Sequence, residues 1–597
     1  MNANMNTTLL NDKETFIYFD INDESVEDNF IDDIKKNLFN DPTNVKFGII
    51  NLKTNCFDLN SSVTHSSSKK KHHFVFDIDC SGSMNDICND GKTKMDHIIH
   101  TLINMVSYFA ESNGLVVYVT VFAFDDIIYN IIENELVSQE NLEKLIQQIK
   151  TIRSKNQTNI EKALINSTEY IQKIIQSQYD ERDVVVSVGE KINYTRIFMT
   201  DGDANQGSCD VMELKKIFCN NLLVTNFFIG FGIDHNAYLL KGLGSGNKNN
   251  YYFVDALEKA GLVYGEILHT VIYKISENVV LNITNGYVYD WKKNIWVDNI
   301  EIDDLVSDTN KVLHIISENP DECSCLVKGI NCLTGNQFEY NITRLHIVPE
   351  TDDGEKIKNI NLEIYKYRQK TQQLLFLINK YNFDKNSYLL NDSTFKNNCM
   401  LRMIDLDDYD KNYKESNDYS FNLKNKMKGL LDELVTFEKL QTDPDDKKMI
   451  KMLCDDVYIC LQTFDTRYGA MFSCARQVSQ GEQRSYSATC TQHLKRSVAV
   501  HNWSHSLRSP SIIYDNVLFQ DENIENIENT VFHNQDEENI SFDQANFYKL
   551  NSSRSDEDLS DNTYTVLEQT DTPYCNPSVL SLMRSCSANV NDNKLFR

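Results

Sequence analysis

One short stretch of the chain places oxygen-bearing side chains at every second position, directly after an apolar run. The run Phe74–Ile78 is followed by Asp79, Ser81 and Ser83, an acid and two hydroxyls. Carboxylate and hydroxyl oxygens are the ligands that suit a hard divalent cation such as Mg2+. Because one loop does not complete a coordination shell, further ligands must come from other loops.

Two other segments are placed to supply them. Asp201 comes directly after the strand-like run Arg196–Thr200, and Thr158 comes just before a helical pattern. In open α/β sheets, ligands bind beyond the carboxyl ends of the strands, and both residues are expected at that edge. We expect one cation to be bound by five residues, Asp79, Ser81, Ser83, Thr158 and Asp201. Water would complete an octahedral shell, with one position open to an acidic group of a partner.

The elements that must position these residues follow from the periodicity of residues 70–275. Strand-like runs alternate with amphipathic patterns such as Lys94–Ala110, and Leu115–Phe124 is a nearly continuous apolar run, typical of a strand buried on both faces. Ile127–Ile132 is expected to pair antiparallel to it at the sheet edge. The alternation predicts βαβ units and an α/β fold with a doubly wound, mainly parallel sheet.

This set of residues resembles the metal-ion-dependent adhesion site of von Willebrand factor A (VWA) domains, in order and in spacing. The resemblance implies a Rossmann-like domain that binds Mg2+ or Mn2+. It also implies that the serines and the threonine coordinate the metal directly or nearly so, that the aspartates do so directly or through water, and that a partner supplies Asp or Glu. The alternative is an A-type fold that kept these loops but binds no metal. Asp77 departs from the pattern, because such strands usually carry an apolar residue there, and a buried acid must be hydrogen-bonded or neutral.

The remaining chain changes character several times. Short strand-like runs separated by turn residues predict a small antiparallel β-sandwich after the A domain, and helical spacing of apolar residues follows. Ser, Asn, Asp and Glu dominate the end of the chain, which favours disorder. The predicted divisions are a polar arm (1–45), a VWA domain (46–275), a β-sandwich-like region (276–350), a helical region (351–480) and a largely disordered acidic tail (481–597).

This layout also resembles intracellular VWA proteins that continue into a Hint module. The stretches Arg467–Met471 and Ala475–Gly481 look like that group. No Hint module is expected here, because the residues that remain are too few and too polar. The polar stretch Tyr179–Tyr194 reads as an insertion of unassigned role.

Composition limits the classes of function. A formal net charge of -28 over 597 residues argues against a nucleic-acid binder, which needs basic patches. No run of about 18 apolar residues and no signal peptide is visible, so no membrane span is expected. The 15 cysteines are scattered, which favours reduced thiols and a cytoplasmic location, with a virion as the alternative.

Several other residues carry weaker signals. Cys323, Cys325 and Cys332, with His314 or His346, could suggest zinc, but free thiols on strands are the preferred interpretation. Cys80 and Cys88 flank the metal loop, the stretch that carries Asp79, Ser81 and Ser83. A redox role there is not expected in a reducing compartment. We expect His72 and His73 to be surface residues and Asp203 to be a turn residue rather than a sixth ligand.

These observations favour a divalent-cation-dependent protein-binding module over an enzyme. No phosphate-binding loop and no nucleophile elbow appears, and Ser81 and Ser83 have no neighbouring histidine base. We therefore predict an adhesion or scaffold function with no catalytic residues. The alternative is a structural component of a particle or assembly, for example of a large DNA virus, in which the site mediates subunit contacts and self-association.

Overall fold

The computed structural model describes residues 9–20, 45–57, 70–344, 360–389, 412–485 and 572–587, apart from short gaps at 89–90, 113, 156, 181–191, 203–204, 220–222, 233–234, 247, 255–259, 303, 333 and 465. Most of the 179–194 insertion, Asp203, His346 and most of the predicted acidic tail lie outside these ranges. Among the described helices, none has both the length and the apolar composition needed to cross a membrane.

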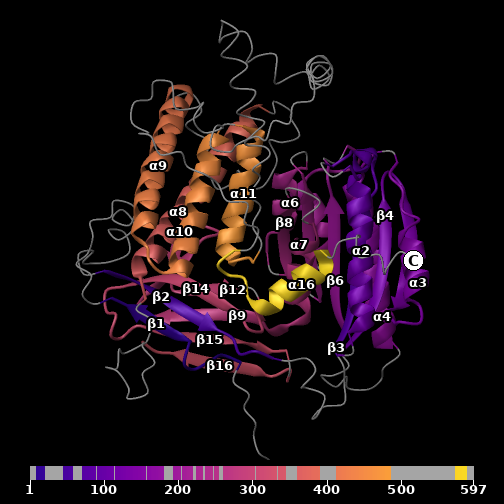
Figure 1. The fold of residues 1–597 in the computed structure, drawn as a ribbon, viewed down its shortest axis with the longest axis horizontal. Helices are drawn as coiled ribbons and strands as arrows, with labels where there is room; N and C mark the ends of the chain where they lie inside the picture. The colour runs from indigo at the N-terminus through magenta and orange to yellow at the C-terminus, as the bar shows by residue number, and fades with distance from the viewer. Residues whose placement is uncertain are drawn as a thin grey trace, which may run out of the picture. The chain divides into compact units, whose positions relative to one another are not determined.

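One sheet of the described structure has six strands in the order β5-β4-β3-β6-β7-β8. Its strands β3, β4, β6 and β8 are labelled in Figure 1. Strand β3 lies between β4 and β6 and is parallel to both, and only β5 is antiparallel to its neighbour. The predicted mainly parallel α/β sheet is thereby confirmed, including its antiparallel edge. The strands are β3 (Lys70–Asp79), β4 (Leu115–Phe124), β5 (Ile128–Leu136), β6 (Ile192–Thr200), β7 (Val224–Phe231) and β8 (Asn249–Val254).

Helices cover both faces of this sheet because successive side chains of β3 point to opposite sides. Phe74 stacks on Phe109 of helix α2 with ring centroids 4.9 Å apart, whereas Val75 packs with Ile171 of helix α4. Thr93 begins α2 with a capping box to Asp96. The helices are α2 (Lys94–Glu111), α3 (Leu142–Ile149), α4 (Ile160–Asp180), α5 (Val211–Phe218), α6 (Ala237–Leu243) and α7 (Ala260–Ile272).

Two antiparallel sheets of five strands each pack face to face in the described structure, as predicted for a β-sandwich. One sheet has the order β1-β2-β14-β10-β11, and in the other β12, β9, β15 and β16 are neighbours, with β13 also paired to β9. Residues of both sheets, such as Ile50 and Leu281, share one buried cluster. The strands are β1 (Phe16–Phe19), β2 (Lys46–Lys53), β9 (Lys274–Thr284), β10 (Tyr287–Asp290), β11 (Ile295–Val297), β12 (Asn299–Ile302), β13 (Leu305–Val306), β14 (Asn310–Ser317), β15 (Ser324–Asn331) and β16 (Gln337–Ile342).

The predicted boundary between arm and A domain was wrong. Strand β2 pairs with β14 along its whole length, and β1 pairs with β2, so both belong to the sandwich rather than to an arm (1–45) or to the A domain (46–275). The physical reason is burial: Ile17, Phe19 and Ile50 fill the space between the two sheets. A pairing that spans more than 250 residues leaves no local signal in the sequence.

The described residues of the predicted helical region form four helices. They are α8 (Leu362–Leu389), α9 (Asn412–Leu440), α10 (Pro444–Gln462) and α11 (Arg467–Glu482). Leu362 packs against the outer face of the first sandwich sheet, and the Arg368 guanidinium donates to the carbonyl oxygen of Val312 over 2.9 Å. The region therefore follows and braces the sandwich.

The end of the chain also contains a packed helix, although a largely disordered tail (481–597) was predicted. Helix α16 (Pro577–Ser587), yellow in Figure 1, contacts α7 and α2. Its buried residues recur with helical spacing, at Val579, Leu582, Met583 and Cys586. The polar composition of the surrounding residues concealed this apolar stripe in the sequence.

His72 and His73 also contradict the sequence interpretation. Both lie within strand β3 and are buried, with 1% of the surface of each exposed. The reason is that β3 begins at Lys70, four residues before the apolar run Phe74–Ile78, and is a central strand. Burial lowers the pKa of His73 to about 4, so its ring is neutral.

Candidate metal site

The metal loop begins where β3 ends. The backbone N–H of Ser81 donates to Asp79 Oδ1 over 2.8 Å, which fixes the carboxylate against its own loop. Ser81 then precedes a short 3-10 helix, Gly82–Asn85, whose Met84 is buried. The Ser81 and Ser83 hydroxyl oxygens lie 3.1 Å apart. The two hydroxyls of this loop therefore lie together, and the backbone of Ser81 joins the Asp79 carboxylate to them.

The end of β6 contributes the second carboxylate. Ser83 Oγ donates to Asp201 Oδ1 over 2.7 Å, which brings two predicted ligands from different loops together. The neighbouring Thr200 Oγ1 donates to Asp79 Oδ2 over 2.6 Å. Sequence reasoning placed Thr200 only at the end of a strand-like run and missed its role in orienting Asp79.

Thr158 completes the predicted set. Its backbone N–H donates to Asn205 Oδ1 over 2.8 Å, and its carbonyl oxygen accepts from the N–H groups of Asn205 and Gln206. A methyl group built on Gly202 would have Ser83 Oγ and Thr158 Oγ1 as its nearest neighbours, each at 3.9 Å. The Thr158 hydroxyl therefore faces the same space as Ser83, beside Asp201. All five predicted residues meet at one edge of the sheet.

Burial sets the electrostatics of the site. Asp79, Ser81, Thr158 and Asp201 are each at most 3% exposed. Burial, followed by the charge of Asp201, raises the pKa of Asp79 to about 6, although hydrogen bonds from Thr200 and Ser81 counteract the rise. Two carboxylates this close repel each other, so the site favours a cation.

Lys94 is a second residue whose role sequence reasoning missed. Its Nζ lies 2.6 Å from Asp201 Oδ2 and 3.0 Å from Asp86 Oδ2. Burial lowers the pKa of Lys94, but the attraction of Asp201 and Asp86 outweighs this and the pKa is raised. The only signal in the sequence was a lysine at the first position of a helix, where a positive charge opposes the helix dipole and requires an acidic partner.

The donor set fits a hard divalent cation. It offers two carboxylates and three hydroxyls from three loops, in line with the oxygen preference of Mg2+ and Mn2+. The described ranges contain no group of three or more His, Cys, Asp or Glu side chains that could hold a metal. Binding at this edge therefore depends on Ser81, Ser83 and Thr158, whose hydroxyls would hold the ion together with the two aspartates.

Asp77, the residue that departs from the family pattern, has a buried partner. The Arg196 Nε atom lies 3.6 Å from Asp77 Oδ2, and both side chains are at most 2% exposed. Arg196 also donates to Thr168 Oγ1 over 2.5 Å. Burial raises the pKa of Asp77 to about 7, and Arg196 and Ser167 only partly offset this rise.

Cys80, next to Asp79, and the three cysteines in and beside strand β15 favour the thiol form. Burial raises the pKa of Cys80 to about 12, and it does the same for Cys325. Burial also raises the pKa of Cys323 and that of Cys332 to about 11 each. Metal ligation and redox chemistry use the thiolate, so these environments do not promote either.

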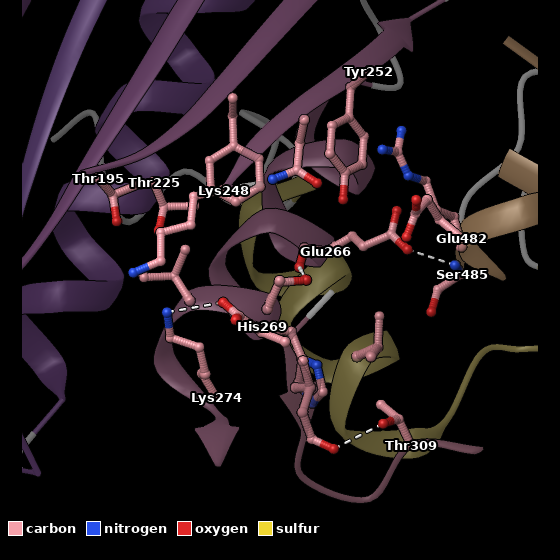
Figure 2. A pocket seen from close by; sticks show the side chains of 18 of the residues that line it. Thr195, Thr225, Lys248, Tyr252, Glu266, His269, Lys274, Thr309, Glu482 and Ser485 are labelled. Atoms are coloured by element: carbon pink, nitrogen blue, oxygen red, sulfur yellow. Dashed lines mark hydrogen bonds and ion pairs between the residues drawn. The ribbon is translucent and has the colours of Figure 1, made fainter. Parts of the chain in front are cut away.

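A separate polar cavity of about 130 Å3 lies near the start of β6 and around α7 (Figure 2). Its charged side chains pair within the wall: Lys274 Nζ lies 2.9 Å from Asp304, and Lys248 Nζ lies 3.4 Å from Glu277. Glu266 Oε1 accepts from the backbone N–H of Ser485 over 2.5 Å. We assign no ligand to this cavity, because its charges compensate each other.

Comparison with known proteins found similarity to solved structures only. No family model matches the chain, and no curated protein matches it. The chain is similar to the ArnB paralog VWA2 from Sulfolobus acidocaldarius, with 14% identity over 74% of this chain and 94% of that one and a TM-score of 0.35. It is also similar to a von Willebrand factor type A protein from Catenulispora acidiphila, with 11% identity over 57% and 77% of the two chains and a TM-score of 0.36. A third structure, proximal thread matrix protein 1 from the mussel byssus with a zinc-occupied MIDAS motif, has 16% identity over 36% and 50% and a TM-score of 0.27.

Proposed function

We propose that this protein is a divalent-cation-dependent protein-binding module of the VWA type, in which Mg2+ or Mn2+ accepts an acidic side chain of a partner. One observation carries the proposal: the 2.7 Å hydrogen bond from Ser83 to Asp201, which joins two loops into one oxygen-lined site. The proposal rests on this geometry and assigns no catalytic step to the site.

The ligand preference of a hard cation supports an acidic partner. The two aspartates neutralise a divalent cation, and the remaining protein ligands, Ser81, Ser83 and Thr158, are neutral. A carboxylate from outside is then the strongest additional ligand that a hard cation can recruit.

Metal binding is tested on the full chain by following free Mn2+ with electron paramagnetic resonance. We expect saturable binding of one ion by the wild type and its loss in Asp79→Asn and Ser83→Ala. The Ser107→Ala variant, which changes a helix α2 hydroxyl away from the site, serves as the matched control. Equal binding by Ser83→Ala and the wild type would refute the assigned ligand set.

Partner chemistry is tested with a phage-displayed peptide library on the immobilised full chain in Mg2+, eluted with EDTA. We expect the eluted peptides to share an Asp or Glu, and to lose binding when that residue is changed to Asn or Gln. Peptides that bind equally well in EDTA, or to Asp201→Ala, would contradict the proposal.

The assembly alternative makes a different prediction for the protein alone. Sedimentation velocity in Mg2+ and in EDTA separates the two, because subunit contacts through the site would produce metal-dependent self-association. The binding-module proposal expects the same sedimentation coefficient in both buffers.

A further inference from the structure

A positively charged side chain, Lys94, contacts the proposed metal site in the described structure. Lys94 Nζ lies 2.6 Å from Asp201 Oδ2, the oxygen that Ser83 leaves free by bonding to Oδ1. The Asp201 side chain is fully buried and that of Lys94 is 16% exposed. The carboxylate of this ion pair is screened from solvent, and the lysine side chain is only partly accessible to it.

The loop that precedes α2 is built to bring this lysine to the site. Its ends pair through a bridge between Ile87 and Thr93, and the Lys94 N–H donates to the Asp86 carbonyl oxygen over 3.0 Å. Asp86 Oδ2 then holds the Lys94 ammonium from the solvent side, at 3.0 Å. Lys94 is also the first residue of α2, where the helix dipole disfavours a cation. Two carboxylates therefore hold Lys94 in a position that its helix does not favour.

We propose that Lys94 is a built-in counter-ion of the metal site, and that a divalent cation reaching Asp201 must displace its ammonium group. This inference rests on the proposed metal-binding function and concerns its regulation. The tethered ammonium neutralises Asp201 when the metal is absent, so Asp201 is never a bare buried carboxylate. The cost is a weaker affinity for the metal, because each binding event must break the Lys94–Asp201 pair.

The test measures Mn2+ affinity of the full chain in wild type, Lys94→Gln and Lys144→Gln. Lys144 is the matched control, since its Nζ lies 2.6 Å from Glu135 and it is 57% exposed, on the separate helix α3. We expect Lys94→Gln to bind Mn2+ roughly tenfold more tightly than the wild type, because the metal no longer has to break the Lys94–Asp201 pair. A tenfold change in affinity corresponds to about 1.4 kcal/mol. Lys144→Gln should bind like the wild type.

A second variant keeps Lys94 and loosens its hold. Asp86 is 63% exposed, so Asp86→Asn removes one tether with little risk to folding, and we expect a smaller increase in Mn2+ affinity. Thermal unfolding supplies a readout independent of affinity. Without metal, Lys94→Gln should melt below the wild type because Asp201 loses its counter-ion, and saturating Mn2+ should remove the difference.

The outcomes separate the two ideas. Equal or weaker Mn2+ binding by Lys94→Gln and Asp86→Asn, with binding by the wild type intact, overturns the counter-ion role and leaves the metal site standing. Absence of Mn2+ binding in the wild type and in Lys94→Gln overturns the metal site and the inference with it.

Discussion

Thr200 Oγ1 donates a hydrogen bond to Asp79 Oδ2 over 2.6 Å, although the two residues are 121 positions apart in sequence. The bond joins the ends of the adjacent strands β3 and β6. The other oxygen of Asp79 is held by the Ser81 backbone. Both carboxylate oxygens are thus oriented before any ligand arrives. Preorganisation of this kind lowers the cost of binding a metal.

Replacing Thr200 with Val should therefore weaken Mn2+ binding while leaving the fold intact. Val keeps the β-branched shape in strand β6, but the hydrogen bond that holds Asp79 is lost. Loss of such an orienting partner costs about 10- to 100-fold in metal affinity. The matched control is Thr101→Val, which removes a buried hydroxyl bonded within α2. An affinity drop of the same size in both variants would mean that Thr200 has no specific role.

The Asp77–Arg196 pair leads to a prediction about stability. Removing Arg196 leaves a buried carboxylate without its counter-ion, so Arg196→Met should lose about 3–5 kcal/mol of unfolding free energy. The double variant Asp77→Leu/Arg196→Met should recover most of that loss, since an apolar pair of similar volume avoids the desolvation of both charges. Urea unfolding measures each value. A double variant as unstable as the single one would show that packing, not charge, dominates there.

The meeting of the five proposed ligands at one edge could be predicted from sequence because these residues sit at the ends of regular elements. Asp79 and Asp201 each end an apolar run, and parallel strands bring such ends to one edge. The two-residue spacing of Asp79, Ser81 and Ser83 then indicated a ligand loop. Topology and spacing were enough for these residues.

Partners that meet only through tertiary packing could not be predicted. Lys94 reaches Asp201 across 107 residues, and β2 pairs with β14 across more than 250. Arg196 was read as the start of a strand, whereas β6 already begins at Ile192 and places Arg196 in its middle, beside Asp77. Neither periodicity nor composition reports which distant side chain will neutralise a buried charge.

The buried histidine His72 should make the protein sensitive to acid. Burial, then the charges of Lys70 and Lys274, lowers its pKa to about 3. Its ordinary pKa of about 6.5 is regained on unfolding. The unfolded state thus binds the proton first, so the stability that neutral His72 confers is complete above pH 6.5 and is lost as the pH falls from 6.5 towards 3.

His72→Phe should remove the part of this dependence that comes from His72. Neither ring nitrogen of His72 has a hydrogen-bond partner among the described residues, and the ring stacks on Phe74 at 6.0 Å, so Phe fits the site chemically. Between pH 7.5 and pH 5.0 the wild type should lose about 2 kcal/mol more than the variant. Urea unfolding at both pH values measures the difference. Parallel losses in the two proteins would exclude His72 as the cause.

Helix α16 packs so closely against Gly265 of α7 that no room is left there for a side chain. A methyl group on Gly265 of α7 would lie 2.4 Å from Met583 Cα, and one on Gly261 would lie 2.5 Å from the Cys586 carbonyl oxygen. The close approach lets Asn104 of α2 donate to that same carbonyl oxygen over 2.9 Å. Any side chain at Gly265 must therefore push α16 away from α7.

Gly265→Ala should accordingly destabilise the protein, although Ala favours a helix over Gly by about 1 kcal/mol. Gly429→Ala in α9 is the matched control, since nothing lies within 4 Å of a methyl group there and only the helix-stabilising effect remains. We expect the melting temperature to fall in the first variant and to rise slightly in the second. Hydrogen exchange localises the effect: amides of α16 should lose protection in Gly265→Ala alone, because the helix is held by its contact with α7. Unchanged protection of α16 in Gly265→Ala would show that the helix is held elsewhere.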